Sequence, residues 1–253
     1  MALTVNTNVG ALNAASAASK TNRGIEVSMS RLASGLRINS GSDDAAGAGI
    51  AARLKANLVG TQQAIRNVAD GIAYAKTGEG ALAEMVNVVA RMKELYTQTA
   101  TGTLSSADTA NITLELGSLS TSLSSIVSST TWAGAAFADI TVTVDAAGTT
   151  QAVTGSLVAA PTVSSLATAD TALTTLATAR ATLGGEINAL NSLANNLSNY
   201  AANLGAAVGT IEDADFAAET TNLVKMQVLQ QAATAMLAQA NGQKQGVLQL
   251  LQG

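Results

Sequence analysis

Apolar side chains recur at every third or fourth position along residues 211–253. The seam positions are Asn222, Met226, Leu229, Ala233, Met236, Ala240, Gln243, Val247 and Leu250. This seven-residue repeat predicts a coiled-coil helix. Leucines one position further along widen the apolar side beyond the width that one partner helix covers, and burial of each large apolar side chain is worth about 1.5–3 kcal/mol. The segment is therefore expected to be buried between subunits.

Residues 1–38 carry a matching pattern. Alternating steps of four and three residues connect Ala11, Ala15, Ala18, Asn22, Ile25, Met29, Leu32 and Leu36. Small side chains fill the first half of this helix, where a partner backbone can approach closely, and larger ones fill the second half. We expect the two terminal helices to pair antiparallel. Their predicted self-assembly seam consists of Ile25, Met29, Leu32, Leu36, Met226, Leu229, Met236, Val247 and Leu250.

Three further helices are expected between the terminal ones. Apolar spacing predicts them over about residues 43–100, 107–129 and 173–208. The first contains Gly60, Gly71, Gly78 and Gly80, and each glycine costs about 1 kcal/mol relative to Ala in a helix interior. The sequence leaves open whether packing keeps this helix continuous or whether it breaks near residues 77–80. The third helix has the strictest seven-residue repeat in the chain, which predicts a rod.

Residues 131–170 have a different texture. Two short runs rich in Val and Thr, 140–144 and 149–153, flank the sequence DAAG at 145–148, which predicts a β-hairpin. The predicted fold class is therefore all-α, a long antiparallel helical bundle or coiled coil with a small β-hairpin-containing tip. Its expected parts are paired terminal helices (1–42 and 211–253), a rod-like second layer (43–130 and 171–210) and a short outer tip (131–170).

A compact helical bundle would show the same periodicity. The ends of compact domains are usually frayed and polar, whereas both ends of this chain are apolar and patterned. This difference favours burial of the ends between subunits.

Composition excludes several classes of function. The 253 residues include no cysteine and no histidine, so the chain lacks disulfides, thiolate chemistry and the commonest general base and metal ligand. A net charge of −4 with 12% charged residues offers no basic surface for nucleic acid. No run of about 18 apolar residues predicts membrane insertion, and the N-terminus lacks the pattern of a cleaved signal peptide. We expect a non-enzymatic protein without metal or cofactor, either soluble or exported without a cleaved signal.

Two blocks of sequence resemble the terminal regions of bacterial flagellins. The first contains RLASGLRINS at 31–40, DDAAG at 43–47, NVADGI at 67–72 and EGALAE at 79–84. The second contains IEDADF at 211–216, QQA at 230–232 and LAQAN at 237–241. The resemblance covers about residues 1–135 and 175–253, with both blocks in the order of the family. The residues between them resemble nothing recognisable, as a family with a variable centre would allow.

The resemblance implies a structural subunit that polymerises into the bacterial flagellar filament for swimming motility. In that family the terminal helices form the inner layer around a channel through which unfolded subunits are exported, so the implied location is secreted and extracellular. The implied partners are further copies of the chain, an export chaperone, and the cap and hook-junction proteins. A hook-filament junction protein is the alternative, which the strength of both blocks disfavours. A membrane-inserting translocator would need an apolar hairpin that the sequence lacks.

The resemblance also suggests a receptor contact. Arg91, Leu95 and Glu115 match, by position, the flagellin residues that a vertebrate Toll-like receptor recognises. The same three side chains would serve equally well in a contact between helices or between subunits.

Two pairs of carboxylates could form a cation site or a catalytic carboxylate pair, but they have a simpler interpretation. Asp43 with Asp44, and Asp213 with Asp215, each open a predicted helix. Negative charge is favoured there by the helix dipole. We therefore predict that these pairs serve the starts of helices.

Overall fold

Five helices account for most of the chain. The structure is a computed structural model that describes residues 7–155 and 159–252, without the side chains of residues 244–245 and 247–252. In this part of the chain the helices are α1 (Val9–Ser34), α2 (Ala45–Thr99), α3 (Ser106–Ser129), α4 (Leu166–Glu212) and α5 (Phe216–Gln252). Between α3 and α4 lie two hairpins, β1 (Thr131–Trp132) with β2 (Ala135–Ala136) and β3 (Ile140–Thr143) with β4 (Thr150–Val153). The predicted fold class is confirmed.

The chain forms two compact units. The terminal unit contains the described residues up to 55 and from 205 onward, and the central unit contains residues 56–204. Their boundaries fall inside α2 and α4, whereas the sequence placed its boundaries at the ends of predicted helices. The predicted division into inner layer, second layer and tip concerns packing in a polymer and stays a prediction.

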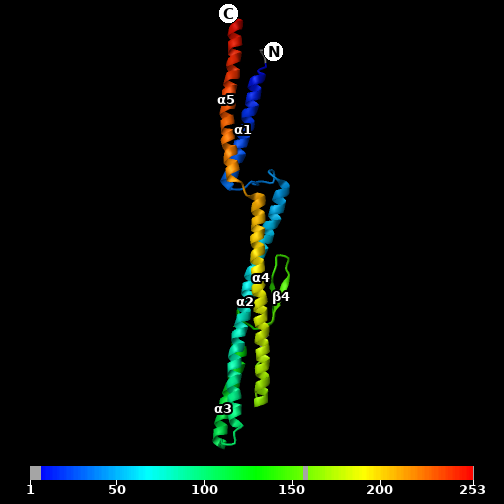
Figure 1. Cartoon of the computed structure of the whole chain (residues 1–253), viewed down its shortest axis with the longest axis vertical. Coiled ribbons are helices and arrows are strands. Elements are labelled where there is room, and N and C mark those ends of the chain that lie inside the picture. Colours follow the sequence, from blue (N-terminus) through cyan, green and yellow to red (C-terminus); the bar gives the residue numbers. More distant parts are fainter. Residues whose placement is uncertain (1–6, 156–158, 253) are drawn as a thin grey trace. The chain divides into compact units, whose positions relative to one another are not determined.

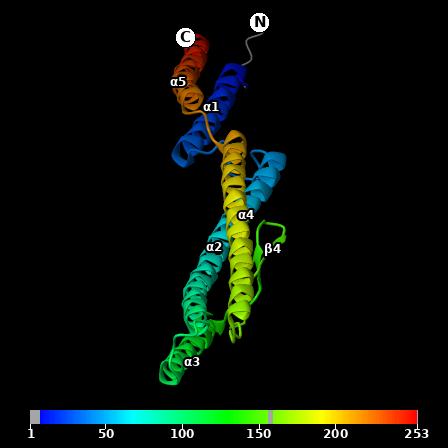
Figure 2. The same ribbon diagram turned by 60° about the horizontal axis from the view of Figure 1, so that its bottom comes forward.

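Regularly spaced leucines of α4 form the core of the central unit. Leu176, Leu183, Leu190 and Leu197 recur every seven residues and are only 0–6% exposed. They belong to one apolar cluster with buried side chains of α2 and α3, such as Leu82. In both views of the ribbon α2 and α4 lie side by side, with α3 along the end of α2 (Figures 1 and 2). All four belong to the seven-residue repeat that the sequence shows over residues 173–208.

The helix α2 is continuous, so the break that its glycines left open does not occur. The residues after β2 and the β3–β4 hairpin account for three of these glycines. A Cβ on Gly60 would lie 2.6 Å from Cβ of Ala146 in the hairpin turn. A Cβ on Gly71 would lie 2.7 Å from Cγ2 of Val142, and one on Gly78 would lie 2.6 Å from Cε1 of Phe137. The tip can therefore approach α2 only where the helix carries no side chain. The cost in helix propensity is offset by burial of the hairpin, in which Val142 and Val153 are 6% and 0% exposed.

The predicted hairpin is confirmed, and a second, shorter one was not predicted. β3 pairs antiparallel with β4 so that Thr143 faces Thr150 across the turn at 145–148. β1 and β2 are joined by Ala133 and Gly134, both with positive φ, at 50° and 82°. Two successive positive φ values are typical of a two-residue hairpin turn. The only sequence signal for this turn was one glycine.

Aromatic residues are rare in the chain, and three of them gather where the tip meets α2. The Tyr74 ring stacks on Phe137 with centroids 4.0 Å apart and meets Trp132 edge-on at 5.5 Å. The Tyr74 hydroxyl also accepts the backbone N–H of Ala138 at 2.9 Å. These contacts anchor the start of the tip on α2.

Candidate assembly surface

The terminal unit is built around an antiparallel pair of α1 and α5. The two helices lie side by side, with the start of α1 and the end of α5 at the same end of the pair (Figures 1 and 2). At that end, Asn8 caps α1 by accepting the N–H of Ala11 at 3.1 Å and donates its Nδ2 to the carbonyl of Ala240 at 3.0 Å. Further along, Gln230 donates its Nε2 to Oδ1 of Asn22 at 2.7 Å.

Small and polar side chains fill the space between these two helices. Thr21, Ser28, Glu219 and Ala233 are 5–8% exposed. Gly24 of α1 faces a methionine of α5, and a Cβ there would lie 3.2 Å from the sulfur. Small residues let the two backbones approach closely, but they bury little apolar surface. The pair therefore has a weak hydrophobic core of its own.

Many large apolar side chains of both helices lie outside this interior. Eight of them, which we call the exposed apolar set, are 43–63% exposed: Val9, Leu12, Val27, Met29, Val224, Val228, Leu229 and Met236. Eight such side chains on one pair of helices favour an interaction with another molecule. Covering each side chain contributes up to about 1.5–3 kcal/mol, so a partner that covers several of them gains several kcal/mol.

The predicted seam divides between the interior of the pair and the exposed apolar set. Ile25, Leu32 and Met226 are partly buried, and Leu36 follows α1 and forms a β-bridge with Asp213. Met29, Leu229 and Met236 are exposed. The side chains of Val247 and Leu250 lie outside the described residues. The role of the seam in assembly stays a prediction.

Sequence reasoning missed several members of the exposed apolar set. Val9, Leu12, Val27, Val224 and Val228 lie off the three-and-four alternation, so the pattern did not select them. Their apolar character at positions away from the seam was the signal that could have found them.

Polar contacts join the segment that follows α1 to the C-terminal end of α4. Arg37, from the RLASGLRINS block, donates its Nη2 to the carbonyl of Ile211 at 2.6 Å and its backbone N–H to that of Glu212 at 2.6 Å. Glu212 is only 8% exposed, and its carboxylate forms an ion pair with Lys55. These contacts tie the segment after α1 to the end of α4.

One member of each acidic pair caps a helix in the structure. Asp44 accepts the N–H of Gly47 at 2.9 Å, and Asp215 accepts those of Ala217 and Ala218 at 2.9 and 3.1 Å. Both interactions are helix caps, as predicted. No cluster of three metal-ligating side chains occurs among the described residues.

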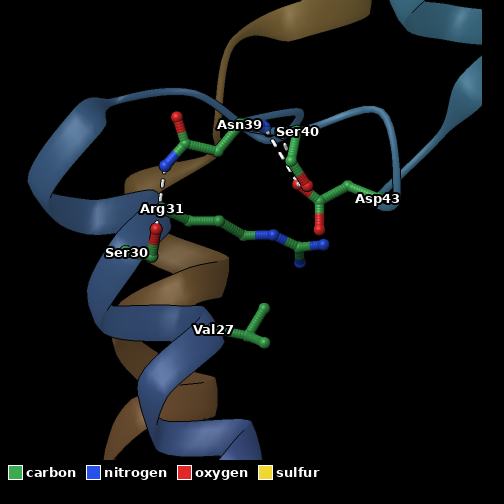
Figure 3. A pocket seen from close by; sticks show the side chains of 6 residues that line it. All are labelled: Val27, Ser30, Arg31, Asn39, Ser40 and Asp43. Carbon is green, nitrogen blue, oxygen red and sulfur yellow. Dashed lines mark hydrogen bonds between the residues drawn. The ribbon is translucent and has the colours of Figure 1, made fainter.

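Asp43 closes the loop before α2 instead of capping the helix. Its Oδ2 accepts the N–H groups of Asn39 and Ser40 at 3.0 and 2.9 Å. These bonds hold the pKa of the Asp43 carboxyl below its usual value, and the bond from the Ser40 N–H has the largest effect. A hollow of about 190 Å³ lies beside this loop (Figure 3), lined by Val27, Ser30, Arg31, Asn39, Ser40 and Asp43.

The residues of the suggested receptor contact are only partly accessible. Arg91 on α2 pairs with Glu115 on α3, with Nη2 and Oε1 2.9 Å apart, and with Glu94 at 3.0 Å. The hydrogen bonds that Arg91 donates to Glu115 and to Glu94 raise the pKa of its guanidinium. Leu95, by contrast, is buried in the core at 2% exposure. Arg91 and Glu115 thus meet at the surface without Leu95, and receptor recognition stays a prediction.

Comparison with known proteins bears on the whole arrangement. The family model of the bacterial flagellin N-terminal helical region matches residues 5–143, and that of the C-terminal helical region matches residues 166–251. The chain belongs to the bacterial flagellin family. Flagellin of Bacillus subtilis (strain 168) is 33% identical over 98% of this chain and 99% of its own length. Flagellin of Listeria monocytogenes serovar 1/2a is 31% identical over the same shares of the two chains.

A third relative is the flagellar filament 30.7 kDa core protein of Treponema maltophilum. It is 32% identical over 98% of this chain and 99% of its own length. Together with the two family matches, these relatives confirm the functional prediction: this flagellin is a structural subunit of the flagellar filament. Among its described residues, no helix combines the length and hydropathy of a membrane span.

Proposed function

We propose that this flagellin assembles into an extracellular filament by burying its exposed apolar set against other copies of the chain. One observation carries the proposal: eight large apolar side chains of α1 and α5 are 43–63% exposed, whereas the fully buried side chains of the pair are small or polar. Hydrophobic burial is the main driving force of most protein association. The two terminal helices therefore gain most of their stabilisation from neighbouring subunits.

The exposed apolar set would also need a binding partner before the subunit assembles. An export chaperone would bind the apolar side chains of the terminal helices while the subunit is unpolymerised, and cap and hook-junction proteins would cover them at the two ends of the filament. These partners are proposed on the same ground, the need to bury the exposed apolar set.

Truncation tests the proposal at the level of the segment. A chain lacking residues 1–38 and 211–253 is expected to remain helical and to form no long filaments, as seen by sedimentation and electron microscopy. Filaments that grow from the truncated chain as readily as from the full chain would refute the proposal.

Point substitutions test it with less disturbance. Val228→Ser and Met236→Ser remove apolar side chains that are 58% and 63% exposed, so the free subunit should keep its helical content. Both should raise the critical concentration for filament growth severalfold. Leu114→Ser is the matched control, because Leu114 is 72% exposed on α3 in the central unit. If Leu114→Ser raises the critical concentration equally, assembly does not depend specifically on the exposed apolar set.

A further inference from the structure

Arg31 of α1 is poorly satisfied by its surroundings. Among the described residues, its Nε is the one buried side-chain nitrogen or oxygen that has no hydrogen-bond partner. Its Nη1 lies 3.8 Å from Oε2 of Glu219, which is beyond hydrogen-bond distance. A guanidinium carries five N–H donors, and an unpaired donor in a partly buried position is costly. The side chain as a whole is 30% exposed, so the guanidinium can still bind an acceptor from outside.

The hollow beside Arg31 is poorly suited to an anion. Figure 3 shows Arg31 extending beneath the carboxylate of Asp43, and Glu219 supplies a second carboxylate. Two negative charges already outweigh the one guanidinium. Oδ2 of Asp43 accepts three hydrogen bonds from Asn39 and Ser40, whereas its Oδ1 accepts none from a described residue. The hollow therefore presents donors from Arg31 and a free acceptor from Asp43.

A carboxamide matches this combination. Its carbonyl accepts from the guanidinium and its NH₂ donates to Oδ1 of Asp43, whereas a carboxylate would meet two like charges. The volume of about 190 Å³ corresponds to roughly six water molecules, which leaves room for one amide. We propose that the hollow binds the side-chain amide of a glutamine from a second copy of this flagellin, an inference that rests on the proposed assembly.

The outer face of α5 offers suitable glutamines. Gln227 and Gln231 are exposed and stand one helical turn apart, and Val224, 57% exposed, precedes Gln227 by three residues on the same face. Val27, which lines the hollow, is 43% exposed. A neighbouring α5 can therefore cover Val27 with Val224 while the amide of Gln227 or Gln231 enters the hollow. Apolar burial and amide recognition then act at one contact.

Cysteine cross-linking tests this pairing directly, because the natural chain contains no cysteine. Subunits with Ser40→Cys are copolymerised with subunits carrying Gln227→Cys or Gln231→Cys and treated with a short bismaleimide. We expect a covalent dimer from the filament with at least one of the two, and none from the depolymerised mixture. Ser30→Cys, which lines the same hollow, replaces Ser40→Cys if the latter does not polymerise.

Gln239→Cys is the matched control, because Gln239 is exposed on α5 but lies outside the row of Val224, Gln227 and Gln231. The inference is overturned if neither glutamine position gives a dimer, if Gln239→Cys gives as much, or if the depolymerised mixture cross-links equally well.

Substitution of Arg31 tests the energetic role of the contact. Arg31→Gln removes the guanidinium, and loss of hydrogen bonds to a charged group should raise the critical concentration for seeded growth about tenfold. Arg23→Gln is the control, because Arg23 is exposed on the same helix and donates to Ser19 at 3.1 Å. If Arg31→Gln grows with the critical concentration of the unsubstituted chain, this inference alone is overturned. Filaments from the truncated chain would overturn the proposed function.

Discussion

Gly71 and Gly80 stand in the same helix with opposite surroundings. A Cβ on Gly71 would lie 2.7 Å from Cγ2 of Val142, a buried and stiff β-branched side chain, whereas a Cβ on Gly80 meets nothing within 4 Å. Gly71→Ala is therefore expected to lower the free energy of unfolding of the central unit by about 1–3 kcal/mol. Gly80→Ala should raise it by about 0.5–1 kcal/mol, because alanine is the better helix former.

Urea titration monitored by Trp132, the single tryptophan of the chain, measures both effects. Stabilisation by both substitutions would contradict the idea that Gly71 provides clearance for the hairpin.

Asp145 makes the turn of the β3–β4 hairpin sensitive to pH. Its carboxylate accepts the hydroxyl of Thr149 and the N–H groups of Thr149 and Ala147, the latter two at 2.8 and 2.9 Å. These bonds hold the pKa of Asp145 below its ordinary value of 3.8, and the bond from the Thr149 hydroxyl has the largest effect. Because the folded-state pKa is lowered, the stabilisation is complete above the unfolded-state pKa and is lost as the pH falls through the folded-state pKa.

Asp145→Asn should therefore narrow the difference in urea midpoint between neutral pH and about pH 2.5. Glu84→Gln serves as the control, since Glu84 is exposed on α2. If Asp145→Asn leaves the acid loss of stability unchanged, the turn does not contribute to it.

At the scale of the element, periodicity specifies some helix faces better than others. In α4 the large residues form a single row of leucines, so pattern and buried face coincide. In α1 the buried row includes Thr21 and Ser28, one position away from the predicted Asn22 and Met29. A count of apolar residues places the seam at the larger side chains. Close approach of α1 and α5 instead buries the row of smaller side chains.

Tertiary context explains what else the sequence left undetermined. The continuity of α2 depends on which glycines face the hairpin, and a glycine's helix propensity says nothing about its neighbours. The hollow at Arg31 depends on how the loop at 39–43 folds back over α1, and no periodic pattern describes such a loop. The terminal pairing was predictable because both helices carry long, regular repeats.

The terminal helices should be the least stable elements of the free subunit. Their interior is small and polar, and local stability follows buried apolar contact. We expect amides of residues 9–34 and 216–243 in the monomer to exchange with deuterium at least about 100-fold faster than those of residues 183–197 in α4. Polymerisation should slow exchange in the terminal helices most. Equal protection of α1 and α4 in the monomer, measured by mass spectrometry, would contradict this expectation.

At the scale of the whole molecule, the two units differ in what they need from a neighbour. The central unit buries rows of Leu, Val and Met within one chain. The terminal unit instead leaves the eight side chains of the exposed apolar set largely in water. With only 12% charged residues and a net charge of −4, the chain has little electrostatic means of attracting copies. We therefore expect burial of apolar surface to be the main driving force for assembly.

Salt identity can separate burial from charge screening. Sulfate is excluded from protein surfaces and strengthens apolar burial, whereas sulfate and chloride screen charges equally at matched ionic strength. The critical concentration for seeded growth should therefore fall severalfold further in sodium sulfate than in sodium chloride. It should fall again on warming from about 10 to 25 °C, because hydrophobic stabilisation weakens on cooling. Val228→Ser, which removes part of the exposed apolar set, should show a smaller response to sulfate. Equal responses to the two salts, measured by sedimentation, would mean that screening of charge drives polymerisation.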